Sequence, residues 1–413
     1  MSSRRNPRDF QSNRIEPMPE SLLPYARQWI EEEDVEAVVA ALRSPLLTTG
    51  PLVERFEEAL AAYVGAHHAV AVNSGTSALY SVLACLGIGP GDDVIVPTLT
   101  FVATASAVLH TGARPVFADI DPDTLLVDPD DVAAKVTSKT RAVIAVDYAG
   151  QPCDYDRLRR LCERHRLALI ADACHSLGAS YRGRKVGVLA DASVLSFHAV
   201  KPITTGEGGA VTTDDATLAE RLRRFRNHGI DRSWRERRAE DDLAYDVVEL
   251  GWNFRIADFQ CALGLSQLRR CDEGVRKRER LAKLYSRELG PIPWVRLPAI
   301  REDVVSSHHL FVPLVDFAGC GLRRSEVMEE LARAGIGTNV HYRPVHLLSA
   351  MRERLGTGHG LCPVAERLYE RLLSLPLYAG LEQEQVSIVS RKVIETLSRN
   401  PVSWETGPAV REG

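Results

Sequence analysis

Residues 196–211 read SFHAVKPITTGEGGAV, and the rest of the sequence is best interpreted outward from this stretch. An apolar run ends near Ser196, and Lys201 lies between this run and a glycine-rich loop. Three glycines, Gly206, Gly208 and Gly209, then predict a tight turn into a second apolar run. Lysine is usually a solvated residue, so a lysine where a buried strand is expected to end requires a chemical reason.

Seven short apolar runs of this kind alternate with segments of helical spacing between about residues 50 and 215. The runs are HAVAVNS, DDVIVP, RPVFADI, RAVIAVD, ALIADA, ASVLSF and GGAVTT. Helical spacing occurs in SALYSVLACLG and YDRLRRLCERHR. Continuous apolar strands separated by helices predict an α/β domain whose seven-stranded, mostly parallel sheet is covered by helices on both faces. Catalytic groups in such sheets gather at strand ends.

The pattern changes after about residue 270. A charged helical stretch, RKRERLAKLYSREL, leads to a second and smaller α/β region with HHLFVPLV, EVMEELARAG and GTNVHYRPVHL. We therefore expect a flexible N-terminal arm at residues 1–22 and a large domain at 23–275. A small C-terminal domain at 276–413 would end in a short flexible tail.

Composition excludes several classes of protein. The 413 residues are 45% hydrophobic and 26% charged with a net charge of -4, which predicts a globular protein without a basic surface for nucleic acid. The polar N-terminus does not resemble a signal peptide, and no apolar stretch approaches membrane-spanning length. The eight cysteines form no CxxC pair, which disfavours a zinc ribbon or a disulfide framework. These features predict a cytoplasmic location.

The segment NSGTSAL, residues 73–79, has two interpretations. A strand ends, a glycine turns the chain, and a helix opens with Thr76 and Ser77. Free backbone N–H groups at that helix N-terminus would bind a phosphate, whereas the same residues also fit an ordinary N-cap. The G-x-G of LGIGPGDDV follows a helix and precedes a strand, so it predicts a turn and no dinucleotide site.

Asp172 closes the apolar run ALIAD, where a buried carboxylate requires a partner. Cys174 and His175 follow and suggest a thiol nucleophile with an imidazole base. Neighbours on a strand point to opposite faces, which disfavours such a hydrolase site. The remaining candidate ligands are too irregularly spaced for zinc and are interpreted as polar loop or interface residues: His308, His309, His341 and His346.

Together, three of these signals satisfy one cofactor, pyridoxal 5′-phosphate (PLP). A partly buried lysine has a lowered pKa and becomes an amine nucleophile, as Lys201 could be. PLP also requires a carboxylate at its ring nitrogen and a phosphate cradle. Asp172 and residues 75–77 supply these, each near the end of a predicted strand.

Over residues 23 to about 395 the chain resembles the DegT/DnrJ/EryC1/StrS family of sugar aminotransferases, which are fold-type I PLP enzymes. The matching stretches are LLTTGPLVERFEEALAAYVG, AVNSGTSAL, VIVPTLTFVATASAVLHTGARPVFADID, IADACHSLGASYRGRKVG, SFHAVKPITTGEGGAVTTDD, GWNFRIADFQCALGLSQL and SLPL. The resemblance departs at Cys174, where alanine or serine is usual, and at Trp252, where histidine or tyrosine is frequent.

This resemblance assigns roles around the cofactor. It makes Lys201 the Schiff-base lysine and Asp172 the partner of the ring nitrogen. Phe101 would stack on the ring, and His175 would lie beside the cofactor hydroxyl.

The resemblance also assigns a phosphate site and an assembly. Gly75, Thr76 and Ser196 would hold the phosphate, and Asn253 resembles an asparagine that reaches it from a neighbouring subunit. This implies a homodimer with shared active sites. By the same resemblance the substrate contacts would be Tyr25, Leu47, Thr48, Ser74, His341, Tyr342 and Arg343.

The activity implied is transfer of an amino group from L-glutamate to the C4 ketone of a nucleotide-linked 4-keto-6-deoxy sugar. VDYAG, FHAVKPITTGEGG and ALGLSQL resemble most the members that aminate the UDP-4-keto-6-deoxy-N-acetyl-L-altrosamine precursor in pseudaminic acid synthesis. A dTDP-4-keto-6-deoxyhexose or a UDP-4-keto-pentose is the alternative substrate. A non-catalytic, PLP-binding regulatory protein is the alternative class. Dehydratases of the family carry histidine in place of Lys201, which disfavours that activity here.

Overall fold

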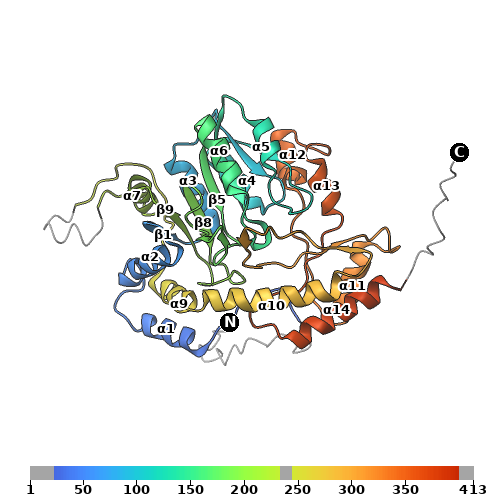
Figure 1. Cartoon of the computed structure of the whole chain (residues 1–413). Coiled ribbons are helices and arrows are strands. Elements are labelled where there is room, and N and C mark those ends of the chain that lie inside the picture. The colour runs from blue at the N-terminus through green and yellow to red at the C-terminus, as the bar shows by residue number, and fades with distance from the viewer. Residues whose placement is uncertain (1–22, 233–243, 400–413) are drawn as a thin grey trace, which may run out of the picture.

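A seven-stranded sheet forms the centre of the computed structural model, which describes residues 23–232 and 244–399 (Figure 1). The strands are β1 (His68–Val72), β2 (Asp93–Pro97), β3 (Arg114–Ala118), β4 (Thr140–Val146), β5 (Ala168–Asp172), β8 (Ala192–Ser196) and β9 (Gly209–Thr213). Each strand falls on one of the seven apolar runs, so the predicted strands are confirmed. The predicted arm at 1–22 and the tail beyond residue 399 lie outside the described residues.

The sheet is mostly parallel, as expected. Its order is β1-β9-β8-β5-β4-β2-β3, and only β9 runs antiparallel to both of its neighbours. The carboxyl ends of the parallel strands therefore meet at one edge of the sheet. Asp172 is the last residue of β5 and Ser196 is the last residue of β8, so the two residues lie at that edge on adjacent strands.

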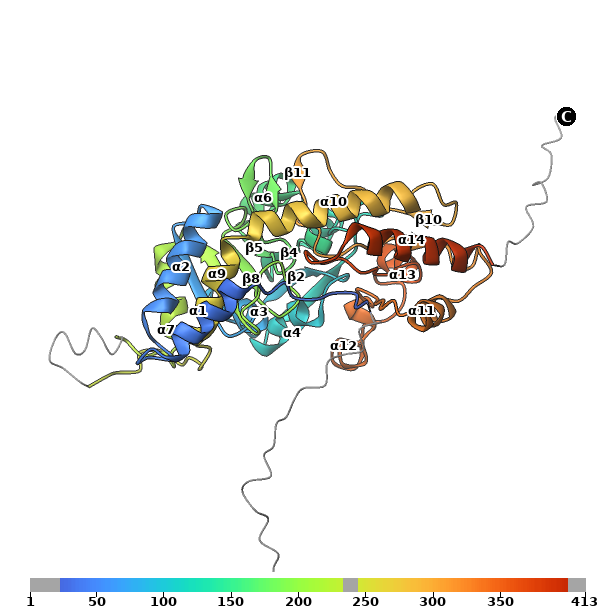
Figure 2. The same ribbon diagram turned by 90° about the horizontal axis from the view of Figure 1, so that it is seen from below.

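Helices cover both faces of the sheet, and Figure 2 shows α3 and α4 on one side with α6 on the other. The helices of this half are α1 (Glu32–Leu42), α2 (Pro51–Val64), α3 (Gly75–Cys85), α4 (Val102–His110), α5 (Pro129–Lys135), α6 (Tyr155–His165), α7 (Ala216–Phe225) and α9 (Asp258–Leu268). The observed architecture confirms the predicted α/β class.

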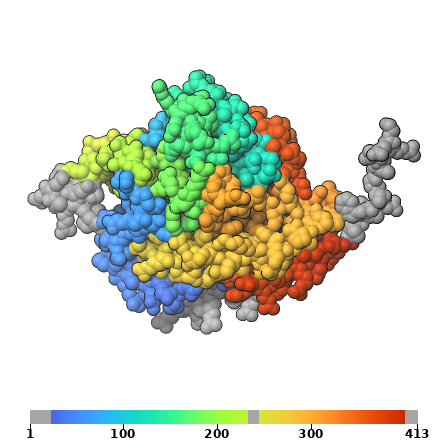
Figure 3. Space-filling view, viewed as in Figure 1, coloured from blue at the N-terminus to red at the C-terminus, as the bar shows by residue number. Residues whose placement is uncertain are grey.

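A helix of 19 residues, α10 (Cys271–Leu289), leads into the C-terminal part and begins before the predicted charged stretch. Figure 3 shows it as a yellow band between the blue N-terminal and red C-terminal surfaces. The elements that follow are β10 (Val295–Arg296), β11 (Val304–Val305), β12 (Leu314–Val315), α11 (Arg324–Arg333), η2 (Val345–Leu347), α12 (Ser349–Leu355), α13 (Pro363–Tyr369) and α14 (Gln383–Leu397). Three short elements precede α10: η1 (Tyr148–Gly150), β6 (Ser180–Tyr181) and β7 (Arg184–Lys185).

The buried side chains form two hydrophobic clusters. The larger one surrounds the seven-stranded sheet, and the smaller one lies among α10, α11 and α14. Helix α10 contributes to both, with Cys271 in the first and Leu281, Tyr285 and Leu289 in the second. Burial of this kind stabilises a fold by roughly 25 cal/mol per Å² of apolar surface. The helix therefore ties the sheet to the C-terminal segments.

Two further observations on the described residues concern membrane-spanning helices and the cysteines. Across 23–232 and 244–399, no helix has the length and apolar character needed to span a membrane. All eight cysteines are free thiols, and only Cys174 is not fully buried.

The turn between β1 and α3 is packed tightly against β9. Ser74 is the N-cap of α3, and its hydroxyl oxygen accepts a hydrogen bond from the Ser77 N–H at 3.1 Å. A Cβ added to Gly209 would lie 2.5 Å from the carbonyl carbon of Ser74 and 2.7 Å from the nitrogen of Gly75. The prediction of a tight turn holds for Gly206, which has φ of +79°. Gly209 is needed for a different reason, since it lets the backbone of the turn approach the strand.

We predict that Gly209→Ala lowers the free energy of unfolding by about 1–3 kcal/mol, because the added methyl group meets backbone that no rotamer change can move. Urea denaturation followed by circular dichroism measures the change. Gly358→Ala is the matched control, since its added Cβ would meet no atom within 4 Å. A Gly209→Ala protein as stable as the control would contradict the close approach.

Candidate active site

A cavity of about 570 Å³ opens at the carboxyl edge of the sheet. It is lined by residues from the large cluster and by the segment 339–342 of the C-terminal part. The predicted site residues that line it are Tyr25, Ser74, Gly75, Thr76, Phe101, Asp172, His175, Ser196, Lys201, His341 and Tyr342. The fold thus brings together residues from several separate stretches of the chain.

Lys201 follows β8 in a turn, where its backbone N–H donates to the carbonyl of His198 at 2.9 Å. The side chain is half-buried in the wall of the cavity. Burial lowers the pKa of the Lys201 amine, while the nearby Cys174 and Asp172 act in the opposite direction. A lysine with a lowered pKa has more of the neutral amine that attacks an aldehyde.

Asp172 is buried at the end of β5, with 6% of its surface exposed. One carboxylate oxygen accepts a hydrogen bond from the Thr104 hydroxyl at 2.7 Å, and the other accepts a long one from the Cys174 N–H at 3.4 Å. Thr104 in turn shares a hydrogen bond with Thr100 at 2.7 Å. A buried carboxylate with so few donors has capacity for a further cationic partner.

The N-terminus of α3 and the end of β8 face each other across a narrow gap. A Cβ added to Gly75 would lie 3.1 Å from both the Cys174 sulfur and the Ser196 Cβ, so only glycine fits without displacement. The free N–H groups of a helix N-terminus and the hydroxyls of Thr76 and Ser196 suit a phosphate group. Ser74 caps the helix, so the N-cap interpretation is correct and is compatible with anion binding at the same turn.

Aromatic and imidazole rings form the opposite wall. Phe101 is 54% exposed, and its ring centroid lies 5.9 Å from that of Tyr342. The Tyr342 hydroxyl and His175 Nε2 are 3.2 Å apart. Burial holds the pKa of His175 well below its usual range, so this imidazole is neutral. An accessible aromatic face beside a cavity is suited to stacking on a planar ring.

Contacts with residues from three parts of the chain fix the position of His341. His341 Nδ1 and the Ser374 hydroxyl are 2.7 Å apart, and the Tyr148 hydroxyl donates to the His341 carbonyl. The ring of Tyr25 lies 5.5 Å from that of His341. These contacts connect the N-terminal segment, η1 and the C-terminal part at one point.

Four predicted residues do not line the cavity of their own chain: Leu47, Thr48, Asn253 and Arg343. Thr48 forms a backbone bridge with Ala257, and Asn253 forms one with Asn227. Leu47 is 47% exposed. The family resemblance predicts that Asn253 reaches the phosphate site of a neighbouring subunit. This role stays a prediction.

The cavity also contains residues that the sequence did not indicate: Thr100, Thr104, His198, Glu207 and Asn339. His309 lies in a segment without regular secondary structure, as predicted for a loop residue, but it is buried in the cavity wall. His346 is fully buried and hydrogen-bonds to Thr98 and Glu366, so it is not a polar loop residue. Among the described residues no group of histidines, cysteines and acids is placed to hold a metal ion.

The expected orientation of Cys174 and His175 is wrong. The two were expected to point to opposite faces of a strand, but both line the cavity because they lie in a turn after β5. The Cys174 thiol donates to the carbonyl of Val194, at a long 3.9 Å, and not to the adjacent imidazole. This arrangement does not provide the thiol–base pair that a hydrolase needs.

Residues 28–394 match the DegT/DnrJ/EryC1/StrS aminotransferase family. The chain belongs to this family. It is 41% identical over 373 residues to the spore coat polysaccharide biosynthesis protein SpsC of Bacillus subtilis (strain 168), covering 90% of this chain and 96% of SpsC.

Two solved structures resemble the fold closely. Spr1654 from Streptococcus pneumoniae in its pyridoxamine phosphate (PMP) form has a TM-score of 0.86 and 33% identity, covering 91% of this chain and 98% of its own. Helicobacter pylori PseC, an aminotransferase involved in the biosynthesis of pseudoaminic acid, has a TM-score of 0.85 and 35% identity, covering 91% and 99%.

The protein is therefore a fold-type I sugar aminotransferase with PLP as its cofactor. The cavity fits this group on its own chemistry. It combines a lysine of lowered pKa, a buried carboxylate with unused acceptor capacity and a glycine-lined helix N-terminus.

We predict that Asp172→Asn retains PLP but slows amine transfer about 100-fold or more, because a neutral amide does not hold the proton on the ring nitrogen. The cofactor content is read from absorbance and the rate from single-turnover kinetics with an amino acid. Asp130→Asn, at a side chain 80% exposed, is the control. Turnover of Asp172→Asn equal to that of the control would remove the role given to Asp172.

Proposed function

We propose that this aminotransferase moves an amino group from L-glutamate to the C4 ketone of a UDP-linked 4-keto-6-deoxy N-acetyl sugar, the precursor of the altrosamine unit of pseudaminic acid. The placement of Lys201 and Asp172 in one cavity beside the N-terminus of α3 is the observation that carries the amine transfer. Similarity to PseC over 91% of the chain supports the sugar substrate.

PLP, when bound, supplies an aldehyde that accepts an amino group and a ring that accepts electrons. Lys201 Nζ acts as the acid and base that moves a proton to and from the substrate carbon that bears nitrogen. Asp172 holds a proton at the ring nitrogen, and Thr104 fixes the direction of its carboxylate. Phe101 and Tyr342, whose ring centroids lie 5.9 Å apart, line the site beside the cofactor.

We further propose a cytoplasmic homodimer in which each active site includes Asn253, and with it Leu47 and Thr48, from the other subunit. This proposal is supported by exposed apolar side chains around these residues. Leu250 is 90% exposed, and Trp252 is 54% exposed while its ring stacks on that of Phe254. Large exposed apolar surface of this kind marks a contact with another protein.

We also propose that the division at residues 23–275 and 276–413 corresponds to a cofactor-binding domain and a domain that shapes the substrate side of the cavity. The large cluster around the sheet and the small cluster beside α10 support it.

The holoenzyme should release 2-oxoglutarate from L-glutamate when a 4-keto sugar nucleotide is the acceptor. In a panel with UDP-linked 6-deoxy N-acetylhexose, UDP-linked pentose and dTDP-linked 6-deoxyhexose, we expect the first to react with the highest kcat/KM. Lys201→Ala is expected to lose activity entirely, because its amine moves the proton. A preference for the dTDP-linked sugar would replace the substrate proposed, and PLP binding without amination of any sugar would favour a regulatory protein.

Co-expression of two inactive variants tests the shared site. Lys201→Ala and Asn253→Ala subunits should together give activity above the sum of the two homodimers, up to about a quarter of wild type, since half of random dimers carry one intact site of two. Differently tagged subunits and size-exclusion chromatography identify the mixed dimer. Activity no higher than the sum would place Asn253 outside the neighbour's site.

A further inference from the structure

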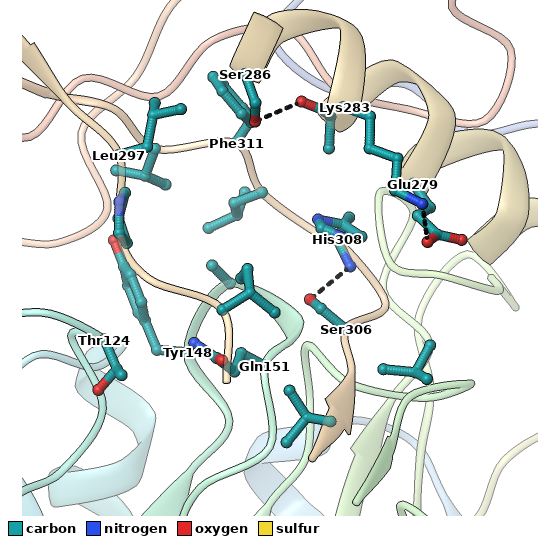
Figure 4. Close-up of a pocket in the computed structure, with 18 residues that line it drawn as sticks. Thr124, Tyr148, Gln151, Glu279, Lys283, Ser286, Leu297, Ser306, His308 and Phe311 are labelled. Carbon is teal, nitrogen blue, oxygen red and sulfur yellow. Dashed lines mark hydrogen bonds and ion pairs between the residues drawn. The ribbon is translucent and has the colours of Figure 1, made fainter. Parts of the chain in front are cut away.

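The segment 306–311 separates two cavities. His308 and Ser306 line a second cavity of about 300 Å³, together with Glu279 of α10 (Figure 4). His309, the next residue, lines the cofactor cavity instead. Two adjacent histidines thus lie in different environments, and His308 is a natural internal control for His309.

His309 has hydrogen-bonding capacity that the described residues do not use. It is 5% exposed, and its ring centroid lies 4.5 Å from that of His175. Its Nδ1 is buried without a hydrogen-bond partner among these residues. A polar atom left unpaired in the interior is costly, so such atoms are usually met by a ligand or by ordered water.

The surroundings of His309 are positively charged. Burial holds the pKa of His309 well below its usual range, and the charges of Lys201 and Arg278 lower it further, so the ring is neutral. Arg278 of α10 is 3% exposed, and its Nε and Nη1 atoms have no hydrogen-bond partner in the described parts of the chain. Among residues 23–232 and 244–399 nothing forms an ion pair with it within 4.0 Å. A buried guanidinium without an ion-pair partner adds positive potential at His309, although Arg278 does not itself line the cavity.

Two other imidazoles of the cavity have partners. His198 faces the carboxylate of Glu207 at 3.9 Å, and His341 shares a hydrogen bond with Ser374. His175 Nδ1 is also buried without a hydrogen-bond partner, but its Nε2 lies 3.2 Å from the Tyr342 hydroxyl, and the family resemblance places this ring beside the cofactor hydroxyl. No arginine occurs among the described residues that line the cavity. An anionic substrate group therefore finds its best site at His309.

We propose that His309, with the charge of Arg278 behind it, receives a carboxylate group of the amino donor. A ring N–H of the neutral imidazole donates a hydrogen bond to a carboxylate oxygen, and Arg278 stabilises the negative charge through space. The inference rests on the proposed function, in which the donor is the dicarboxylic amino acid L-glutamate. The sugar acceptor carries no carboxylate, so His309 serves only the first half of the reaction.

The experiment compares the two half-reactions in the holoenzyme. Absorbance follows the cofactor between its pyridoxal and pyridoxamine forms, first with L-glutamate and then with the 4-keto sugar. His309→Phe is expected to raise the apparent Kd for glutamate about 10- to 100-fold, the loss typical of a hydrogen bond to a charged group. The half-reaction with the sugar is expected to stay within about twofold of wild type.

A binding measurement without turnover complements the kinetics. Glutarate, which has the two carboxylates of the donor and no amino group, should bind the His309→Phe holoenzyme about 10- to 100-fold more weakly in calorimetry. His309→Asn, which keeps an N–H donor, should lose less. His308→Phe should bind glutarate and react as wild type does, since its side chain faces the other cavity.

Unchanged glutamate and glutarate affinities in His309→Phe, or equal losses in both half-reactions, would overturn the inference and leave the proposed function intact. Arg278→Met and Arg278→Lys give a second pair of variants if His309→Phe does not fold. Weaker glutarate binding in Arg278→Met but not in Arg278→Lys supports the role of the charge. Equal glutarate affinities of the two variants overturn that role. A wild-type enzyme that accepts amino groups from no amino acid would overturn the proposed function and this inference together.

Discussion

The active site depends on one buried carboxyl group at the end of a central strand. Asp172 is placed there by β5, whose neighbours β4 and β8 exclude water from its sides. Thr104 on α4 is its closest hydrogen-bond donor among the described residues, so most of its acceptor capacity faces the cavity. Burial of a carboxylate is costly, and a cationic partner offsets that cost. The position of Asp172 therefore suits the ring nitrogen of the cofactor.

Much of this arrangement could be predicted from the sequence. Strands that are buried on both faces must be apolar along their whole length, so all seven could be located. A polar residue at or after the end of such a run lies near the sheet edge, and this pattern indicates Asp172 and Lys201 as site candidates, whereas Ser196 is assigned by the family resemblance. These predictions use only local sequence, because each needs only one apolar run and the few residues that follow it.

The remaining features depend on which segments pack together, and local patterns do not show that. Thr104 reaches Asp172 because α4 and β5, far apart in the chain, meet over the sheet. The sequence predicts a loop position for His309, because nothing in HHLFVPLV indicates which of its two histidines faces the cavity. It also predicts only a turn at Gly209, although the backbone of Ser74, far away in the sequence, is what requires glycine there.

The place of Cys174 in the cavity has a consequence for selectivity between nucleophiles. A thiolate adds to aldehydes as an amine does, and this sulfur lines the same cavity as Lys201. Burial raises the pKa of the Cys174 thiol well above its usual range and lowers that of the Lys201 amine. The same dry environment thus keeps the sulfur protonated and inert while it frees the nitrogen to react. Burial is the largest cause of both shifts, and the neighbouring Asp172 raises the pKa of both groups.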